Sequence, residues 1–253
     1  MISGDIAGCG ARNPQGCAVQ AEQSGLDFLL KAEFVAGQLT PAGSNYTFLV
    51  KLCLGERTGV AIYKPRDGEA PLWDFPRGTL YKREYASYLL SQILGWHFIP
   101  ATVIREGPHG IGTVQEYIEH DPKVNYHSLT AAEAPALQMV ACFDLVANNT
   151  DRKSVHLLLS PDGKLWGIDH GLTFHADTKI RTVIWDFRGK LIPDHLLASL
   201  RALDASLGHP HPQLQEFLDL LQAEEVRALH RRLQWVLTEG VYPGVAGQRP
   251  FPP

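Results

Sequence analysis

The chain has 253 residues, of which 45% are hydrophobic and 20% charged, and its formal net charge is −4 at pH 7. Such a chain forms a globular protein with a sizeable core, long enough for two lobes of roughly 100 to 150 residues each and for no further domain. The negative net charge disfavours nucleic acid as a partner, because phosphate backbones bind basic surfaces. None of the cysteines has CxxC spacing, which argues against a zinc ribbon or a disulfide framework.

The two ends of the chain differ in composition from the middle. Residues 1–23 are rich in Gly, Ala and Gln and predict a loose leader, whereas residues 240–253, with four prolines and three glycines, predict an extended tail. No charged start followed by an apolar run indicates a signal peptide, and no stretch approaches the ~20 apolar residues of a membrane span. We therefore expect a cytoplasmic protein without a transmembrane segment.

A first pair of strands is predicted over residues 34–39 and 46–52, joined by a turn over residues 40–45. The small residues of this turn, Ser44 and Asn45 among them, could lie over the phosphates of a nucleotide. The same six residues would also make an ordinary hairpin turn.

The next two predicted elements carry a lysine on a strand and then a glutamate on a helix. Residues 60–65 form a β-branched, apolar strand with Lys64 near its end, and residues 82–94 have apolar positions at helical spacing, with Glu84 in the first turn. Taken singly, the lysine is more often a solvated edge charge and the glutamate a partner of the helix dipole. A strand lysine followed by a helix glutamate is also the ion pair that positions phosphates in kinases, and the joint order favours this interpretation.

The next segments complete a small sheet. Residues 71–80 predict a packed surface loop, and residues 102–105 and 112–117 predict two further strands around a Gly-Pro-His-Gly turn. Four consecutive residues end this segment: Gln115, Glu116, Tyr117 and Ile118.

The second half of the chain is predicted to be mostly helical. A helix over residues 129–149 has apolar positions at helical spacing, and Asp144 on it is expected to be a structural hydrogen-bond partner of the following loop.

Two more helical regions are expected over residues 193–207 and 213–237, again from the spacing of apolar residues. Near the end of the second region, Arg231 and Arg232 are expected to form a solvated face.

Two carboxylates flank a predicted hairpin. Asp151 lies in a loop before strands over residues 157–159 and 165–168, and Asp169 ends the second strand. Phosphoryl transfer needs one carboxylate to orient or accept the proton of the attacking hydroxyl and another to hold the metal that bridges the phosphates. Asp151 fits the first role and Asp169 the second, although either motif alone is also typical of an ordinary turn.

Four motifs together resemble the atypical kinases of the phosphatidylinositol 3- and 4-kinase class, their HipA-type bacterial relatives and, more closely, a bacterial family distantly related to that class. The motifs are IYKP (62–65), REYASYLLSQILG (83–95), FDLVANNTDR (143–152) and GIDHG (167–171). The resemblance implies an α+β, two-lobed protein-kinase-like fold, with a small antiparallel sheet and one helix over residues 24–118 and a mostly helical lobe over 119–239. It also implies ATP and a divalent metal, Mg²⁺ or Mn²⁺, as cofactors. By the same resemblance, residues 115–118 fall where a kinase joins its two lobes, the backbone of residues 116–118 is the expected adenine contact, and residues 172–188 hold the place of an activation segment.

Two positions depart from the pattern of that superfamily. His156 stands where those kinases commonly carry an asparagine as a second metal ligand, and imidazole suits Mn²⁺ better than Mg²⁺. His156 could also contact phosphate or be a packed histidine. Lys153 stands where the lipid kinases usually have a histidine after Asp-Arg, and its cation could still face the γ-phosphate. With these departures, the candidate catalytic set is Asp151, Arg152 and Lys153, and the candidate metal ligands are His156 and Asp169.

Two other functions remain open besides an ATP-dependent phosphotransferase. A cluster of His156, His170 and His175 with the two aspartates would suit a metal-dependent phosphoesterase, but it leaves Lys64 and Glu84 without a role. A nucleotide-binding pseudokinase that acts through partner contacts is the non-enzyme alternative, and the unusual His156 keeps it open. As phosphate acceptor, a protein or small molecule is favoured over a lipid, because no polybasic patch or basic amphipathic helix is visible.

Overall fold

Five antiparallel strands form the sheet of the N-terminal lobe, in the order β1-β2-β3-β5-β4. The strands are β1 (Glu33–Leu39), β2 (Phe48–Leu54), β3 (Arg57–Pro65), β4 (Thr102–Gly107) and β5 (Gly110–Glu116). This is a computed structural model that describes residues 24–41 and 43–244. The predicted leader and residues 245–253 of the predicted tail lie outside the described residues.

One face of the sheet is covered by a helix over residues 24–31 that the sequence patterns did not predict. Its Phe28 and Leu29 are buried together with Ala61 and Tyr63 of β3, which alternate with the half-exposed Ile62 and Lys64. Gly59 permits this packing, because a Cβ there would lie 2.8 Å from the Phe28 ring. The alternation of β3 thus directs Lys64 away from the core of the sheet.

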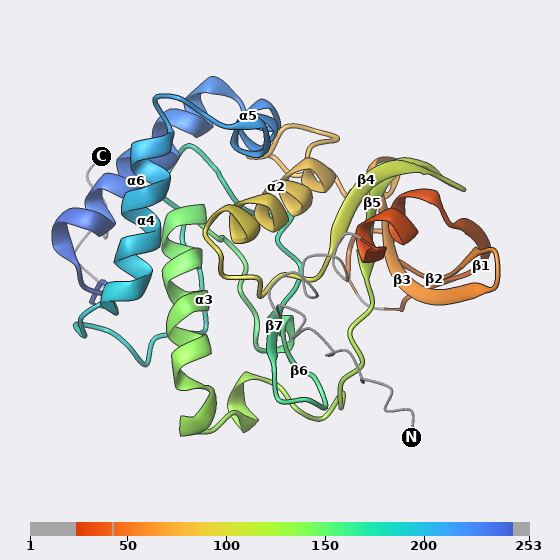
Figure 1. Ribbon diagram of the computed structural model, residues 1–253, viewed down its shortest axis with the longest axis horizontal. Helices are drawn as coiled ribbons and strands as arrows, with labels where there is room; N and C mark the ends of the chain where they lie inside the picture. The colour runs from red at the N-terminus through yellow and green to blue at the C-terminus, as the bar shows by residue number, and fades with distance from the viewer. Residues whose placement is uncertain (1–23, 42, 245–253) are drawn as a thin grey trace, which may run out of the picture.

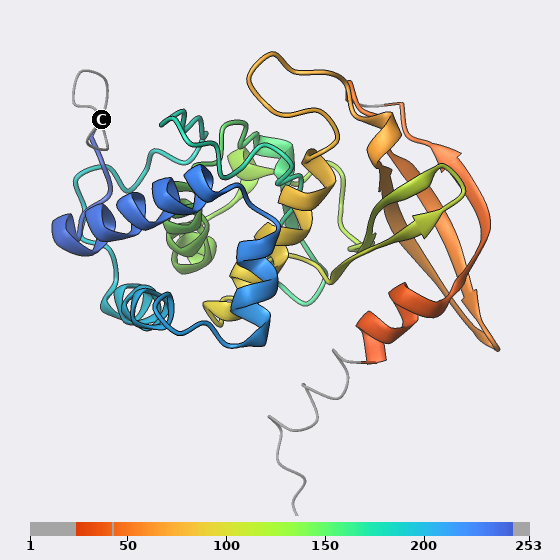
Figure 2. The ribbon, with the colours of Figure 1, turned by 90° about the horizontal axis from the view of Figure 1, so that it is seen from above.

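The C-terminal lobe is helical, with one short hairpin. Its helices are α3 (Ala134–Ala147), α4 (Asp194–Ser206), α5 (Pro212–Asp219) and α6 (Ala223–Glu239), and the hairpin pairs β6 (Leu157–Leu159) with β7 (Leu165–Gly167). The two-lobed α+β architecture expected from the sequence is confirmed. Figures 1 and 2 show the sheet on one side and the helices on the other.

The observed helices correct two predicted boundaries. The helix expected over residues 129–149 starts only at Ala134, because Asn125 and Thr130 cap two short 3-10 helices before it. The helical region expected over residues 213–237 is two helices, because Gln222 and Glu225 form a capping box that begins α6 after a break.

Arg232 was expected on a solvated face, and this is wrong: it is buried and donates hydrogen bonds to the carbonyl oxygens of Val146 (2.9 Å) and His175 (3.2 Å). The helical spacing explains the burial, since position 232 shares a face with the buried Leu229 and Val236.

Helix α2 (Leu80–Ile93) lies between the two lobes, but its apolar side chains join the core of the helical lobe (Figure 2). Tyr88, Leu89 and Leu90 belong to the same buried cluster as residues of α3 to α6, whereas the sheet has a separate core. The helix that carries Glu84 therefore packs against the helical lobe, whereas Lys64 belongs to the sheet of the other lobe.

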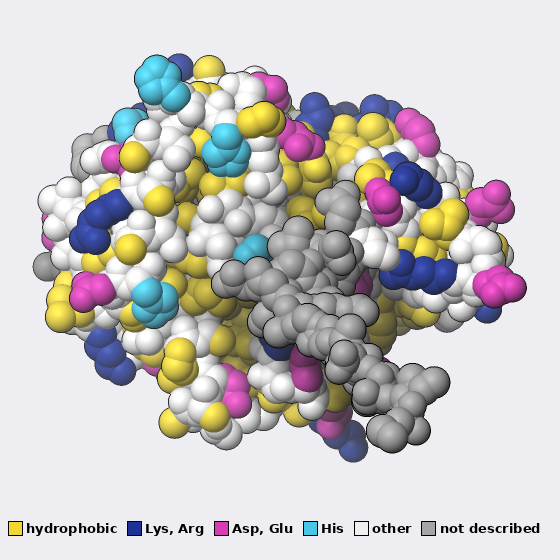
Figure 3. Space-filling view, viewed as in Figure 1, with side chains coloured by type: hydrophobic (Ala, Val, Ile, Leu, Met, Phe, Trp, Pro, Cys, Tyr) yellow, Lys and Arg dark blue, Asp and Glu magenta, His cyan; other side chains and the backbone are white. Residues whose placement is uncertain are grey.

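The outer surface carries charges of both signs. On the face in Figure 3, Lys and Arg side chains are interspersed with Asp and Glu. Within the part of the chain that the structure describes, no helix has the length and apolar character needed to cross a bilayer.

Candidate active site

A cavity of about 450 Å³ lies between the lobes and brings together most of the predicted site residues. Those that line it are Ser44, Asn45, Lys64, Gln115, Glu116, Tyr117, Ile118, Asp151, Lys153, His156 and Asp169. The two remaining candidates, Glu84 and Arg152, are buried and do not line this cavity. We call this cavity the interlobe cleft.

Lys64 joins the two lobes at the centre of the cleft. Its Nζ lies 3.0 Å from Glu84 Oε2 on α2 and 3.1 Å from Asp169 Oδ1 at the end of β7. Although burial works against the charged amine, the Asp169 and Glu84 carboxylates raise the pKa of Lys64 above its ordinary value. The lysine is therefore a fixed cation, and it points into the cleft from the strand face opposite the sheet core.

Asp169 is presented to the cleft by an unusual backbone conformation. Its φ of 61° is in the left-handed region that non-glycine residues rarely adopt, and 48% of its side chain is exposed. Lys64, with His156 adding to it, holds the pKa of Asp169 well below its usual range, so the carboxylate is ionised. A strained aspartate that stays charged and accessible is typical of a functional position.

His156 faces the same carboxylate, with its Nε2 3.2 Å from Asp169 Oδ2. The Lys153 backbone N–H donates to Nδ1 at 3.3 Å, so in this arrangement Nε2 carries the proton and donates to Asp169. Coordination of a metal through Nε2 would require this ring to give up its bond to the Lys153 amide and turn its lone pair to the ion.

Asp151 lines the cleft beside the predicted catalytic Lys153. Its backbone N–H donates to Asn149 Oδ1 at 3.1 Å, and Lys153 Nζ lies 2.7 Å from Asp151 Oδ2. The Asp151 side chain is 20% exposed and that of Lys153 is 54% exposed. The aspartate is thus held by the loop, whereas the lysine is a cation on an exposed side chain.

Arg152 points away from the cleft into the protein. Its guanidinium makes two bonds to Asp144 of α3, at 3.0 and 2.9 Å, and further bonds to the Ile168 carbonyl (3.2 Å) and His170 Nε2 (2.7 Å). The expected structural role of Asp144 is confirmed by this pair and by its bond from the Asn149 amide at 2.9 Å. Arg152 ties the Asp151 loop to the backbone that carries Asp169, so its geometry is that of a positioning residue.

The three histidines considered for a metal site do not come together. His170 is buried, with its backbone N–H donating to both oxygens of Glu84 at 3.1 Å, and His175 Nε2 donates to the Asp74 carbonyl at 2.9 Å. Among the described residues, no group of three or more His, Cys, Asp and Glu side chains could hold a metal ion by itself. The prediction that these three histidines form a metal-binding cluster is therefore wrong, and the phosphoesterase alternative loses its basis.

At the junction of the lobes, the backbone hydrogen bonds leave one N–H group available to a ligand. The N–H groups of Glu116 and Tyr117 donate to Ala101 (2.8 Å) and Val60 (3.4 Å), whereas the described residues supply no acceptor for the Ile118 N–H. The Gln115 amide is buried and donates to Thr102 Oγ1 at 2.8 Å. Of the predicted adenine contacts, the Ile118 N–H is the free one.

Three apolar residues that were not predicted from the sequence also line the cleft: Ile62, Leu158 and Ile168. Ile62 comes from the sheet and the other two come from β6 and the residue after β7. The alternation of β3 could have indicated Ile62, because it lies two residues before Lys64 on one strand face. No sequence signal distinguishes Leu158 from its buried neighbour Leu157.

The turn predicted to lie over phosphates does line the cleft, through Gly43, Ser44 and Asn45. The Asn45 side chain is already engaged, since its Oδ1 accepts the Ala70 N–H at 2.7 Å. Ser44 is exposed and lines the cleft.

Two buried histidines beside the cleft make stability depend on pH. Burial lowers the pKa of His156, and burial with the Arg152 charge lowers the pKa of His170 well below its ordinary 6.5. At low pH the unfolded chain therefore binds more protons than the folded chain. The contribution of these two histidines to stability is fully present above about pH 6.5 and is lost as the pH falls below that value. We expect the thermal midpoint to fall from about pH 7 to pH 5, and His170→Gln to flatten this slope while the exposed His209→Gln does not. An equal slope in His170→Gln and wild type would contradict a neutral buried ring.

Comparison with solved structures shows a kinase-like fold. The Golgi casein kinase matches with a TM-score of 0.59 and 15% identity, covering 87% of this chain and 75% of that one. The same kinase with Mn/ADP bound matches with a TM-score of 0.58 and 16% identity at the same coverage.

Comparison of sequences identifies a relative. No family model matches the chain. "Protein Rv2133c" of Mycobacterium tuberculosis is 38% identical over 274 residues, which cover 90% of this chain and 98% of that protein. At this identity and coverage, the chain belongs to the same family as protein Rv2133c.

Proposed function

We propose that this protein is an ATP-dependent phosphotransferase of the phosphatidylinositol 3-/4-kinase-like superfamily, which transfers the γ-phosphate to a hydroxyl of a protein or small molecule. The observation that carries the proposal is the bridge of Lys64 between Glu84 and Asp169, with Asp151 in the same cleft. This lysine can bind phosphate oxygens, and Glu84 fixes its position. The kinase-like fold and the Mn/ADP complex of the Golgi casein kinase support the assignment of the nucleotide.

The residues of the cleft fit a divalent ion that arrives with the nucleotide. Mg²⁺ is usually held by one or two carboxylates together with phosphate oxygens, and the ionised, half-exposed Asp169 supplies such a carboxylate. His156 stands ready as a second ligand after a change of tautomer. The bound ion would neutralise charge on the transferred phosphate.

The remaining groups divide the work of binding and transfer. The apolar Ile62, Leu158 and Ile168 can enclose an adenine ring whose acceptor nitrogen binds the Ile118 N–H. Asp151 can accept a hydrogen bond from the acceptor hydroxyl and orient it. Lys153, released from Asp151, can neutralise the γ-phosphate, because its side chain is exposed and long.

The test of this proposal is nucleotide binding that depends on Lys64. A ligand selective for the folded state raises the thermal midpoint, so millimolar ATP with Mg²⁺ or Mn²⁺ should stabilise the wild type, and Lys64→Ala should lose most of that rise. Lys51→Ala is the matched control, since Lys51 is an exposed lysine on the neighbouring strand β2. No stabilisation of the wild type by any purine nucleotide would refute the proposal.

A nucleotide-binding pseudokinase is the second candidate. The ion pair of Lys153 with Asp151 and the donation of His156 to Asp169 favour it, because each engages a carboxylate that transfer would use. Incubation with γ-labelled ATP separates the two functions. Release or transfer of the label supports the phosphotransferase, and binding without any turnover supports the pseudokinase.

A further inference from the structure

The turn that presents Asp169 to the interlobe cleft is strained at both ends. Asp169 and Phe174 each have a φ of 61°, in the left-handed region that non-glycine residues rarely adopt. Such conformations persist only where the surrounding structure holds them. We call residues 169–174 the aspartate turn, and its conformation therefore depends on the residues that hold it.

Three side chains in the first two turns of α2 hold the aspartate turn. Glu84 accepts the His170 N–H at 3.1 Å. Arg83 donates from Nη1 to the Thr173 carbonyl at 2.7 Å, and Ser87 Oγ lies 3.1 Å from Thr173 Oγ1. The Thr173 hydroxyl donates to the His170 carbonyl at 2.8 Å. Helix α2 thus holds both the start and the end of the turn.

Arg83 is itself fixed by α6. Its Nη2 pairs with Glu225 Oε1, and both residues are buried. The other oxygen of Glu225 accepts the Gln222 N–H at 2.8 Å in the capping box of α6. Hydrogen bonds between charged groups are strong and directional, so the first turn of α6 sets the position of the guanidinium.

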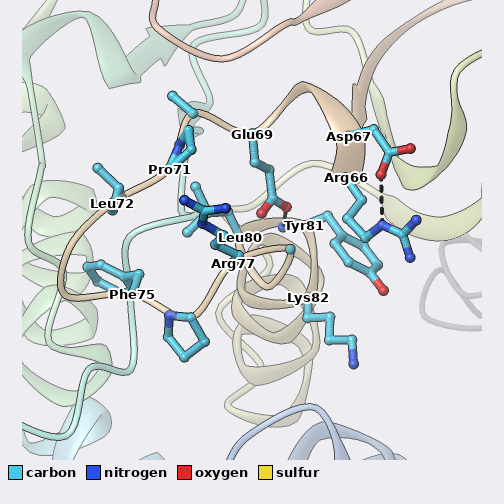
Figure 4. Close-up of a pocket in the computed structure, with 13 residues that line it drawn as sticks. Arg66, Asp67, Glu69, Pro71, Leu72, Phe75, Arg77, Leu80, Tyr81 and Lys82 are labelled. Atoms are coloured by element: carbon cyan, nitrogen blue, oxygen red, sulfur yellow. Dashed lines mark hydrogen bonds and ion pairs between the residues drawn. The ribbon is translucent and has the colours of Figure 1, made fainter.

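The loop before α2 also packs on this guanidinium. Figure 4 shows the loop over residues 69–79 curving past the start of α2, with Glu69 next to Tyr81. Glu69 accepts the Tyr81 N–H at 2.8 Å, which fixes the loop to the helix. The ring centre of Phe75 lies 4.9 Å from the guanidinium carbon of Arg83. Arg83 is therefore buried between α6, this loop and the aspartate turn.

The same turn of α2 also holds the lysine of the cleft. Glu84 follows Arg83 directly, and its Oε2 lies 3.0 Å from Lys64 Nζ. Lys64 Nζ in turn lies 3.1 Å from Asp169 Oδ1. Two neighbouring residues of α2 therefore hold the two charged groups of the cleft that meet: Glu84 holds Lys64, and Arg83 holds the turn that carries Asp169.

We infer that Arg83, assisted by Ser87, is a positioning residue for phosphate transfer, which acts through Thr173 to keep Asp169 directed into the cleft. The inference rests on the proposed phosphotransferase function. Arg83 does not line the cleft, so its contribution is to hold a strained backbone that carries a metal-binding carboxylate. Residues that orient a metal ligand in this way commonly contribute about 10- to 100-fold to metal affinity or activity.

The test separates the hold on the aspartate turn from the stability of the buried ion pair. Arg83→Met removes the donors and leaves Glu225 buried without its partner, so the thermal midpoint should fall. Arg83→Met with Glu225→Met replaces both charges with apolar side chains and should recover most of that fall. This double variant still lacks the donor to Thr173, so its aspartate turn should remain released.

Two readouts are made on the double variant at a temperature where circular dichroism shows that it is folded. Without nucleotide, hydrogen exchange of the amides of residues 170–174 should be at least about tenfold faster than in the wild type, because local opening is easier. With nucleotide, the factor by which Mn²⁺ tightens ATP binding should fall at least about tenfold. Metal-free ATP affinity should change little, because Glu84 still holds Lys64.

Arg201→Met is the control, because Arg201 is an exposed arginine on α4 of the same lobe. It should match the wild type in both readouts. Wild-type exchange in the double variant would overturn the inference. Recovery of metal-dependent ATP binding together with stability would overturn it as well, since Arg83 would then serve stability alone.

Ser87→Ala keeps the inference testable if neither Arg83 variant folds, because it removes one hydroxyl and no charge. It should speed exchange of the aspartate turn and weaken the effect of Mn²⁺ on ATP binding, and wild-type values of both would overturn the inference. A wild type that binds no ATP would refute the proposed function. Exchange of the nucleotide-free turn would still decide whether Arg83 holds it.

Discussion

Replacing Asp151 with asparagine is expected to reduce phosphate transfer by about 10²- to 10⁴-fold, the usual contribution of a positioned base, while ATP affinity changes little. The asparagine keeps the shape of the side chain and the backbone bond to Asn149, but it cannot accept a proton or hold the Lys153 cation. A loss in kcat without a loss in binding identifies an interaction made only in the transition state.

The measurement is single-turnover release of γ-phosphate, with nucleotide affinity determined by titration on the same preparations. Lys153→Ala is the informative companion, because it removes the partner of Asp151 and leaves the carboxylate in place. Wild-type transfer by Asp151→Asn would exclude its role as a base. Loss of both binding and transfer would instead indicate that the aspartate holds the loop.

Replacing Asp144 with alanine is expected to lower the free energy of unfolding by about 3–5 kcal/mol, the cost of leaving a buried charge without its partner. Asp144 and Arg152 have fully buried side chains and make two hydrogen bonds to each other. The variant would leave the Arg152 guanidinium with only the Ile168 carbonyl and His170 as acceptors. Urea denaturation followed by circular dichroism measures the loss.

The exposed Asp162→Ala is the control for removal of a carboxylate from this lobe, and it should change stability by well under half of that amount. In the double variant Asp144→Ala with Arg152→Leu, the loss should be smaller than the sum of the two single losses, because neither charge is then left alone. Additive losses would show that the two residues act independently and that Arg152 does not position the Asp151 loop through Asp144.

Local patterns were sufficient for most of the strands and helices. The alternation of residues 60–65 predicted β3, and the spacing of apolar residues after Glu84 predicted α2. The helix over residues 24–31 was not predicted, because its few apolar residues are too short a run to show helical spacing. Their burial depends on the sheet against which they pack. The capping box that starts α6 was present in the sequence as Gln222 and Glu225, but continuous apolar spacing concealed the break.

The sequence by itself indicated three charged groups of the cleft, Lys64, Asp151 and Asp169, because each stands near or after the end of a strand or helix that the local pattern predicts. Only the tertiary structure decided what these groups contact. It paired Arg152 with Asp144 inside the protein, separated His170 from His175, and packed α2 into the helical lobe while Lys64 remained on the sheet. The physical reason is that burial and ion pairing depend on segments far apart in the chain, which no local pattern of apolar and charged residues records.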